Sequence, residues 1–252
     1  MTDEFRKAAL AADRSPLEAP VDGAKHSKRA EVRSAERLAA ALAMIAGFID
    51  AYGFITYGVY VSFMSGNTTQ TGYQTAEGAF GPASLSALAI LFFVGGAFAG
   101  TLLMQFAGRW ARRAVFGVVA AVLAAIIGFT LLRLLSAAVH VATGSFAMGM
   151  MNIALSRVGA QPVSLTFVTG ALSRIGSSLA LALRRAPLPD AQGPWDTHLR
   201  RAMLLGRIWA GFLAGALLSG ATAPRYGAWV LAAPALILAV LAAFDGPKRG
   251  AR

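Results

Sequence analysis

Asp50 is the residue whose type and position most need a chemical explanation. It lies inside an apolar stretch, residues 38–57, which is long enough to cross the roughly 30 Å hydrocarbon core of a membrane as a helix. An uncompensated charge near mid-bilayer costs at least about 2.5 kcal/mol, so this carboxyl group needs a partner or a function. Three explanations are open: Asp50 is protonated, it pairs with Arg174, or it is hydrogen-bonded to nearby Ser, Thr and Asn side chains. A functional acid and a purely structural ion pair both fit.

The stretch GVYVSFMSGNTTQTG, residues 58–72, follows directly, and ten of its fifteen residues are Gly, Ser, Thr, Asn or Gln. Backbone that stops being helical inside a bilayer must be buried in protein or line a wet cavity. We expect Gly66 at such a break with a positive φ, and Ser65, Asn67 and Thr68 as caps of the half-helix that follows. The free N–H groups of that half-helix would suit an anion or a polar headgroup. The alternative is that these small residues only allow close helix packing.

A related pattern recurs about a hundred residues later. GFIDA at 47–51 matches GMMNI at 149–153, and SFMSGNTTQTG at 62–72 matches TFVTGALSRIG at 166–176. Two matching pieces in the same order and at nearly equal spacing indicate an internal repeat. With three membrane crossings in each half, the second copy would run in the opposite sense. Many transporters are built from such inverted repeats. Their substrates bind near the midplane of the membrane, at the Gly-interrupted segments of the repeats.

The repeat predicts a binding site assembled from both halves. Asn152 takes the place of Asp50 but lacks its charge. The predicted substrate-binding residues are Asp50, Ser65, Gly66, Asn67, Thr68, Asn152, Thr169, Gly170, Ser173 and Arg174.

Composition identifies an integral membrane protein. Of the 252 residues 56% are hydrophobic and 14% are charged, and the mean hydropathy of +0.58 lies outside the range of ordinary soluble proteins. The absence of Cys excludes disulfides, thiolate metal sites and cysteine nucleophiles. His140 is the one His of the apolar part, and we expect it to be packed or interfacial. The sequence offers no catalytic constellation, so we predict no enzyme, no metal and no cofactor.

Six apolar stretches are long enough to span, and two further segments, 59–78 and 163–185, are ambiguous. Both segments are predicted to be broken or re-entrant, because letting both span would move Arg109, Arg112, Arg113 and Arg157 outside, against the positive-inside bias. Both termini then face the cytoplasm. The six predicted spans are residues 38–57, 84–107, 114–135, 137–155, 203–221 and 228–244.

The net charge of +11 arises almost wholly in the membrane part. Seven of the 12 acidic residues lie in the first 37 positions, against eight of the 23 basic ones. We read the excess as a cytoplasmic-side signal that attracts anionic lipid, and predict no nucleic-acid partner. The predicted organisation is a disordered charged tail, 1–37, a first membrane repeat, 38–135, a second, 136–246, and a cytoplasmic tail, 247–252.

The segment GFIDAYGFITYGVYVSFMSGNTTQTG resembles the YoaK family of bacterial inner-membrane proteins, through Gly47, Asp50, Ala51 and the motif at 65–67. That family is described as having six transmembrane segments and no known function. The resemblance implies a bacterial plasma-membrane protein with an all-α helix bundle, and it supplies no substrate.

We expect a small secondary transporter or permease for a small polar or anionic solute. A non-transporting scaffold that binds lipid or a partner is the alternative, and self-association into a homo-oligomer stays open. A cavity that reaches Asp50 and Asn67 would favour transport, whereas a dry, packed centre would favour the scaffold.

Overall fold

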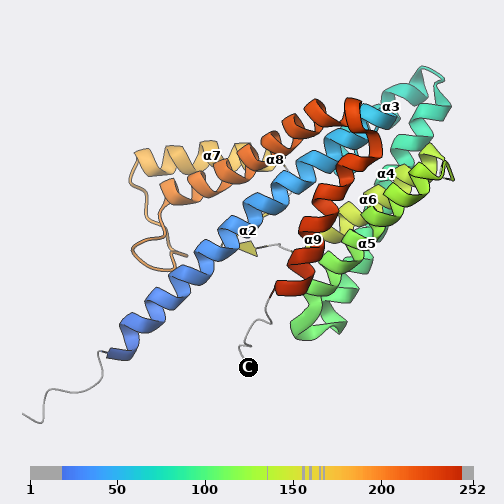
Figure 1. The fold of residues 1–252 in the computed structure, drawn as a ribbon. Helices are drawn as coiled ribbons and strands as arrows, with labels where there is room; N and C mark the ends of the chain where they lie inside the picture. Colours follow the sequence, from blue (N-terminus) through green and yellow to red (C-terminus); the bar gives the residue numbers. More distant parts are fainter. Residues whose placement is uncertain are drawn as a thin grey trace, which may run out of the picture. The chain divides into compact units, whose positions relative to one another are not determined.

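The fold is built from helices (Figure 1). The computed structural model describes residues 19–134, 136–154, 157–158, 161–164, 166 and 168–245, with side chains from Arg29 onward. The elements are α2 (Ala19–Tyr57), α3 (Met64–Ala76), α4 (Phe80–Phe106), the 3-10 turn η1 (Gly108–Trp110), α5 (Ala111–Leu131), α6 (Ala137–Ala154), the paired strands β1 (Arg157–Val158) and β2 (Gln161–Pro162), α7 (Val168–Leu183), α8 (His198–Tyr226), the 3-10 turn η2 (Gly227–Leu231) and α9 (Ala232–Phe244).

The chain divides into two compact units, residues 1–38 and 39–252. The predicted disorder of residues 1–37 is wrong for 19–37, because these residues form the first part of α2. Ala, Arg, Lys and Glu dominate this segment and are good helix formers. A helix that already exists also extends without a new nucleation cost. Residues 1–18 and 246–252, which include the whole predicted C-terminal tail, lie outside the described part.

Four described stretches are long and apolar enough to cross a membrane, namely Arg29–Tyr57, Phe80–Phe106, Ala111–Leu131 and His198–Phe244. The last one contains α8, η2 and α9, and the chain leaves α8 at Gly227, which has a φ of +53°. The shorter α3 and α7, of 13 and 16 residues, extend about 20–24 Å and do not reach across a core of roughly 30 Å. The all-α membrane fold is thus confirmed, while the number of six crossings stays a prediction.

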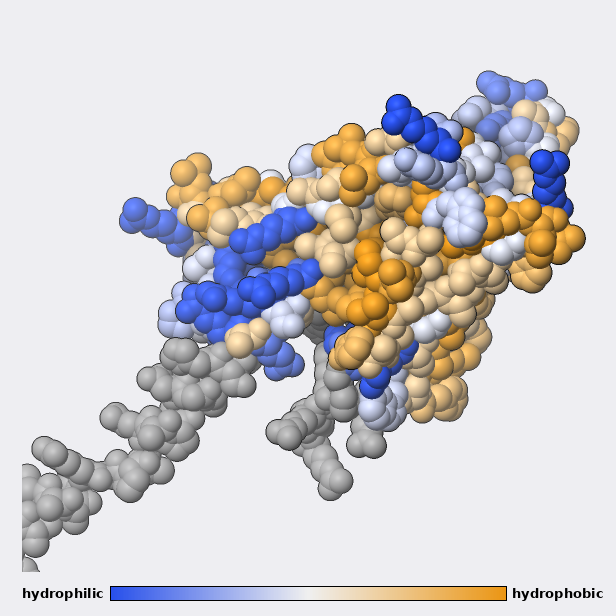
Figure 2. All heavy atoms as spheres, in the orientation of Figure 1, coloured by the Kyte–Doolittle hydropathy of each residue, from blue (hydrophilic) through white to orange (hydrophobic). Residues whose placement is uncertain are grey.

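Within unit 39–252 the helices pack in pairs. The main pairs are α4 with α6, α5 with α9, α7 with α8, α3 with α4, and α5 with α6. Deeply buried side chains on three of these helices are Phe116, Leu123, Met148 and Leu238. Large apolar side chains also lie on the outside, where Phe98 is 67% and Phe106 83% exposed, and Figure 2 shows such residues over much of the visible face. An outer surface this apolar suits lipid rather than water.

Glycines bring four of these helices into backbone contact. A Cβ on Gly47 or Gly215 would overlap a carbonyl oxygen across the contact of α2 with α8, and a Cβ on Gly96 or Gly149 would do so across the contact of α4 with α6. The oxygens concerned belong to Phe212, Met44, Phe146 and Phe93 respectively. Small residues allow close approach of this kind between membrane helices. The two pairs therefore depend on glycine at these positions.

Two arginines connect the start of α5 to the end of α9. Arg112 forms an ion pair with Asp245. Arg113 donates to the carbonyl oxygens of Ala242, at 2.6 Å, and Ala243. Cations at the end of a helix satisfy its last carbonyls and complement its dipole. The arginines that signal topology in the sequence thus also hold two helix ends together.

The connection between α7 and α8 is organised around Arg201. Its guanidinium group donates to both carboxylate oxygens of Asp196, at 3.0 and 2.8 Å, and to both oxygens of Asp190, each at 3.0 Å. The backbone N–H of Gln192 also donates to Asp196, and the hydroxyl of Thr197 caps α8 by accepting from the N–H of Arg200. Arg201 therefore fixes this connection to the first turn of α8.

We predict that acid loosens this connection. The hydrogen bonds from Arg201 are the main cause that holds the pKa of Asp196 below its usual range. A carboxylate whose pKa is lowered by folding contributes stability above its unfolded pKa of about 3.9, and this stability is lost as the pH falls through the folded pKa. The melting temperature should therefore drop below about pH 4. Arg201→Gln should cost about 1–3 kcal/mol at pH 7 and make the protein less sensitive to acid.

The control for this prediction is Asp190→Asn, because the Asp190 side chain is 60% exposed and exposed ion pairs contribute little. Melting curves from pH 7 to pH 3 in detergent provide the measurement. Equal acid sensitivity in the parent protein and in Arg201→Gln would contradict the assignment.

Candidate functional site

Asp50 anchors the segment that joins α2 to α3. Its side chain is 4% exposed, and its Oδ1 accepts the backbone N–H of Ser62 at 2.7 Å and that of Phe63 at 3.2 Å. Hydrogen bonds to a carboxylate are stronger than neutral ones. The carboxyl group thus fixes the chain just before α3 begins.

Asn67 holds the same segment from the other side. It is fully buried, and its amide bonds to both backbone groups of Tyr60: Nδ2 donates to the carbonyl at 2.5 Å and Oδ1 accepts the N–H at 3.1 Å. Tyr60 stacks on Phe54, with ring centroids 4.5 Å apart, and meets Phe63 edge-on at 5.2 Å. Since a Cβ on Gly66 would lie 2.5 Å from the Phe63 ring, glycine is required there for packing.

The threonines of α3 bond to their own helix. The hydroxyls of Thr68, Thr69, Thr71 and Thr75 each donate to the carbonyl four residues earlier, at 2.6–3.2 Å. Ser and Thr commonly form such bonds inside helices. These threonine hydroxyls already donate within α3. The polar composition of this stretch therefore does not indicate that they donate to a ligand.

A smaller polar contact occurs in the second half. Ser164 Oγ donates to Asn152 Oδ1 at 3.3 Å, and Ser164 follows Asn152 by the same twelve positions that separate Ser62 from Asp50. Asp50 on α2 and Asn152 on α6 thus each contact the chain twelve residues further on.

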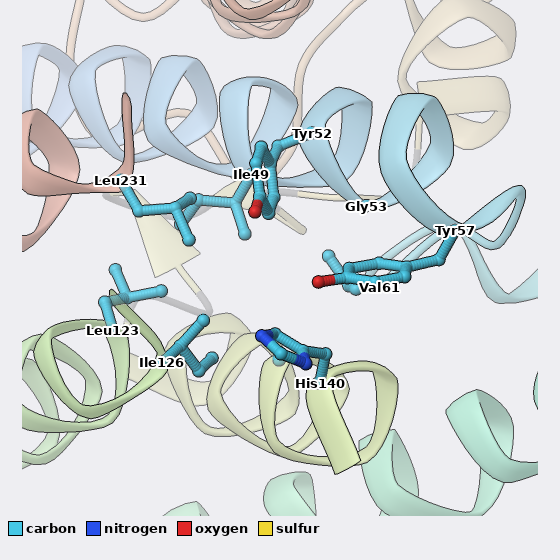
Figure 3. A pocket seen from close by; sticks show the side chains of 10 residues that line it. Ile49, Tyr52, Gly53, Tyr57, Val61, Leu123, Ile126, His140 and Leu231 are labelled. Atoms are coloured by element: carbon cyan, nitrogen blue, oxygen red, sulfur yellow. The ribbon is translucent and has the colours of Figure 1, made fainter. Parts of the chain in front are cut away.

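A cavity of about 20 Å³ lies near the end of α2 and is also lined by residues of α5, α6 and η2 (Figure 3). Its polar lining residues are Tyr52, Tyr57 and His140, and Figure 3 shows the Tyr57 hydroxyl and the His140 ring facing the same space. The other lining residues are Ile49, Gly53, Val61, Leu123, Ile126, Gly144 and Leu231. A cavity of this size with two or more polar partners has room for one water molecule.

Comparison with known proteins places the chain in a family. Residues 38–244 match the pattern of a family described as "Protein of unknown function (DUF1275)". The chain belongs to the DUF1275 family. It is also 33% identical over 219 residues to the UPF0700 transmembrane protein RA0705 of Rhizobium meliloti (strain 1021), a match that covers 84% of this chain and 87% of that protein. No solved structure matches it.

His140 connects two helices of the DUF1275 chain beside the cavity. Its Nδ1 lies 3.0 Å from the carbonyl oxygen of Ser136. Its Nε2 contacts the Thr130 hydroxyl, which also donates to the carbonyl of Ile126. The Tyr57 and His140 rings are 5.2 Å apart. The sequence prediction of a packed His is consistent with this burial, but it missed the cavity that His140, Tyr52 and Tyr57 share.

The predicted break at Gly66 is wrong. The described α3 begins at Met64 and runs through Gly66, and no side chain caps its start. The positive φ, +70°, is at Gly58, because the chain turns directly after α2. Ser65 and Thr68 are exposed on α3, and the Thr68 hydroxyl bonds to the Met64 carbonyl rather than to a helix-start N–H.

Among the three explanations for Asp50 the hydrogen-bonded one fits the DUF1275 structure, although the donors are backbone amides rather than polar side chains. Arg174 is exposed on α7, and the described contacts of the buried Asp50 do not include it. Thr169 and Ser173 are also exposed on α7, and Gly170 is half-buried in it. The structure thus brings Asp50, Gly66 and Asn67 together around residues 58–63, and does not gather all ten predicted residues in one place.

None of the ten predicted site residues lines the cavity. Among the described residues there is also no group of three His, Asp or Glu side chains that suits a metal ion. The cavity and the 58–63 segment nevertheless adjoin, because Val61 lines the cavity while its neighbour Ser62 is held by Asp50. The anchored segment therefore forms part of the cavity wall.

Proposed function

We propose that this DUF1275 protein is a small secondary transporter or permease for a small polar or anionic solute, built from two inverted halves, residues 38–135 and 136–246. Three sets of contacts support the repeat, and they share one register. Gly149 lies 102 positions after Gly47, Phe146 lies 102 after Met44, and Asn152 lies 102 after Asp50.

The partner helices share a second register. Gly215 lies 119 positions after Gly96, and Phe212 lies 119 after Phe93. The contacts of Gly47 and Gly215 between α2 and α8 therefore have equivalents in the contacts of Gly149 and Gly96 between α4 and α6, whereas the contact of Gly211 with the Ala40 carbonyl has none. This correspondence is the observation that carries the proposal, because transporters built from inverted repeats bind substrate at the interface between the repeats.

The cavity fits the proposed repeat by its position, although neither Asp50 nor Asn67 lines it and the criterion for transport given in the sequence analysis is therefore not met. Ile49, Val61 and Leu123 come from the first half, whereas His140, Gly144 and Leu231 come from the second. A volume of about 20 Å³ admits one water molecule and no larger solute. The described conformation is therefore closed at this point, and transport would require the halves to move apart around it.

The alternative is a non-transporting scaffold, and the roles of Asp50 and Asn67 favour it. Both side chains are used to hold residues 58–63, as a purely structural device would require. In a scaffold the centre stays closed, whereas in a transporter it opens to each side in turn.

Cysteine accessibility separates the two functions. The chain has no native Cys, so a single introduced thiol is free of background. Val61 and Ile126 line the cavity and are 4% and 5% exposed. In sealed proteoliposomes, Val61→Cys and Ile126→Cys should react with a charged, membrane-impermeant thiol reagent added from either side, because a transporter opens its central cavity both ways.

The matched control is Met148→Cys, which is fully buried and does not line the cavity. It should stay unreactive from both sides until the protein is denatured. If the cavity positions react no faster than Met148→Cys, transport through this centre is rejected and the scaffold is retained.

The proposed orientation has both termini in the cytoplasm, because this places most arginines of the connecting segments inside. Reporter fusions at residues 1 and 252 should both indicate the cytoplasmic side. One external terminus would require an odd number of crossings and would exclude the inverted arrangement.

A further inference from the structure

We propose that Arg29, Arg33 and Arg37 bind the phosphate group of an anionic phospholipid. All three are exposed on the first part of α2. A spacing of four residues places side chains on one face of a helix. The three guanidinium groups therefore form a single row, which we call the arginine row. This proposal does not depend on the transport function.

The arginine row lines a hollow of about 430 Å³ together with Ala30 and Ser34. Neither Glu31 nor Glu36, the two acids of residues 29–38, lines it. The ion pairs described above use Arg112 and Arg201 rather than the arginines of this row. The lining thus carries three positive charges and one hydroxyl, which suits an anion with several acceptor oxygens.

The place of the row in the chain matches the headgroup layer. Arg37 directly precedes Leu38, where the apolar segment begins, and Arg29 lies eight residues earlier in the same helix. Eight residues of helix extend about 12 Å, and each headgroup layer is roughly 5–8 Å thick. Arg33 and Arg37 therefore lie at headgroup depth, and Arg29 lies at its water side.

The chemistry favours an anionic lipid over a zwitterionic one. Guanidinium groups bind phosphate through two parallel hydrogen bonds. A bound anion also relieves the repulsion between three neighbouring cations, whereas the ammonium group of a choline headgroup adds to it. Basic residues next to a membrane span attract anionic lipid by about fivefold in affinity per residue.

The test measures lipid binding to the full chain in neutral detergent by native mass spectrometry. The probes are short-chain phosphatidylglycerol, short-chain phosphatidylcholine and inorganic phosphate. We expect the protein to prefer phosphatidylglycerol over phosphatidylcholine. R29Q/R33Q/R37Q should lose about a hundredfold in affinity for phosphatidylglycerol. R29K/R33K/R37K should lose less, since it keeps the charges but not the fork geometry.

The matched control is R133Q/R184Q/R225Q, which removes the same charge from three exposed arginines elsewhere and should keep the preference. The proposal is overturned by equal binding of the two lipids, by an undiminished preference in R29Q/R33Q/R37Q, or by an equal loss in the control. Displacement of phosphatidylglycerol by inorganic phosphate at equal concentration would also overturn it, since the site would then hold a free anion.

Discussion

Gly96→Ala and Gly215→Ala are expected to be the most damaging small substitutions in this protein. Each adds one methyl group, and that group would overlap the carbonyl oxygen of Phe146 or Met44 on the facing helix. Backbone atoms cannot move aside as a flexible side chain can, so the helices must separate. We expect a loss of more than about 4 kcal/mol, or no folded protein in the membrane, which is exceptional for a single substitution.

The control is Gly72→Ala in α3, where a Cβ meets nothing within 4 Å. Alanine is a better helix former than glycine, so this change should stabilise by up to about 1 kcal/mol. The measurement is the yield in the membrane fraction and the melting temperature in detergent. Similar damage from Gly96→Ala and Gly215→Ala would also support the repeat. A stable Gly215→Ala protein would mean that the α2–α8 contact is looser than described.

Asp50→Ala is expected to have the second large effect. It removes the acceptor for the N–H groups of Ser62 and Phe63, and a buried donor left without a partner costs about 1–3 kcal/mol. The loss in the free energy of unfolding should therefore reach about 2–6 kcal/mol. Asp50→Asn keeps an acceptor oxygen and should cost less than Asp50→Ala.

Asn152→Ala is the matched control, since it removes an acceptor that serves one hydroxyl, that of Ser164. Its cost should be about 1 kcal/mol. Chemical denaturation of the purified variants gives all three values. If Asp50→Ala proved as mild as Asn152→Ala, Asp50 would not be an anchor, and the role of functional acid predicted from the sequence would regain support.

The membrane fold was predictable because the length of each apolar stretch can be read directly from the sequence. The predicted span 38–57 ends where α2 ends, at Tyr57, and α9 ends at Phe244 as predicted for 228–244. The start of α2 was not predictable in this way, because charged residues look alike in a helix and in a disordered tail. Helix propensity, rather than hydropathy, distinguishes a helix from a disordered tail in such a charged segment.

The site was predictable only in part. Asp50 and Asn67 stand out because polar groups are rare in apolar segments, and both are buried and bonded. The sequence does not tell which glycine takes the positive φ, since Gly58 and Gly66 both lie in the same polar stretch. It also hides the cavity, whose polar residues Tyr52, Tyr57 and His140 come from two helices with no shared spacing pattern.

The hydrogen bonds within α3 lower the free-energy cost of transferring its threonine hydroxyls from water to lipid. Hydropathy scales assign every threonine the cost of removing a free hydroxyl from water. In α3 the hydroxyls of Thr68, Thr69, Thr71 and Thr75 keep their hydrogen bonds wherever the helix lies, so most of that transfer cost disappears. The segment partitions into lipid more readily than its composition indicates. The exposed carboxylate of Glu77 directly after α3 then favours a position of this end of the helix in water rather than in hydrocarbon.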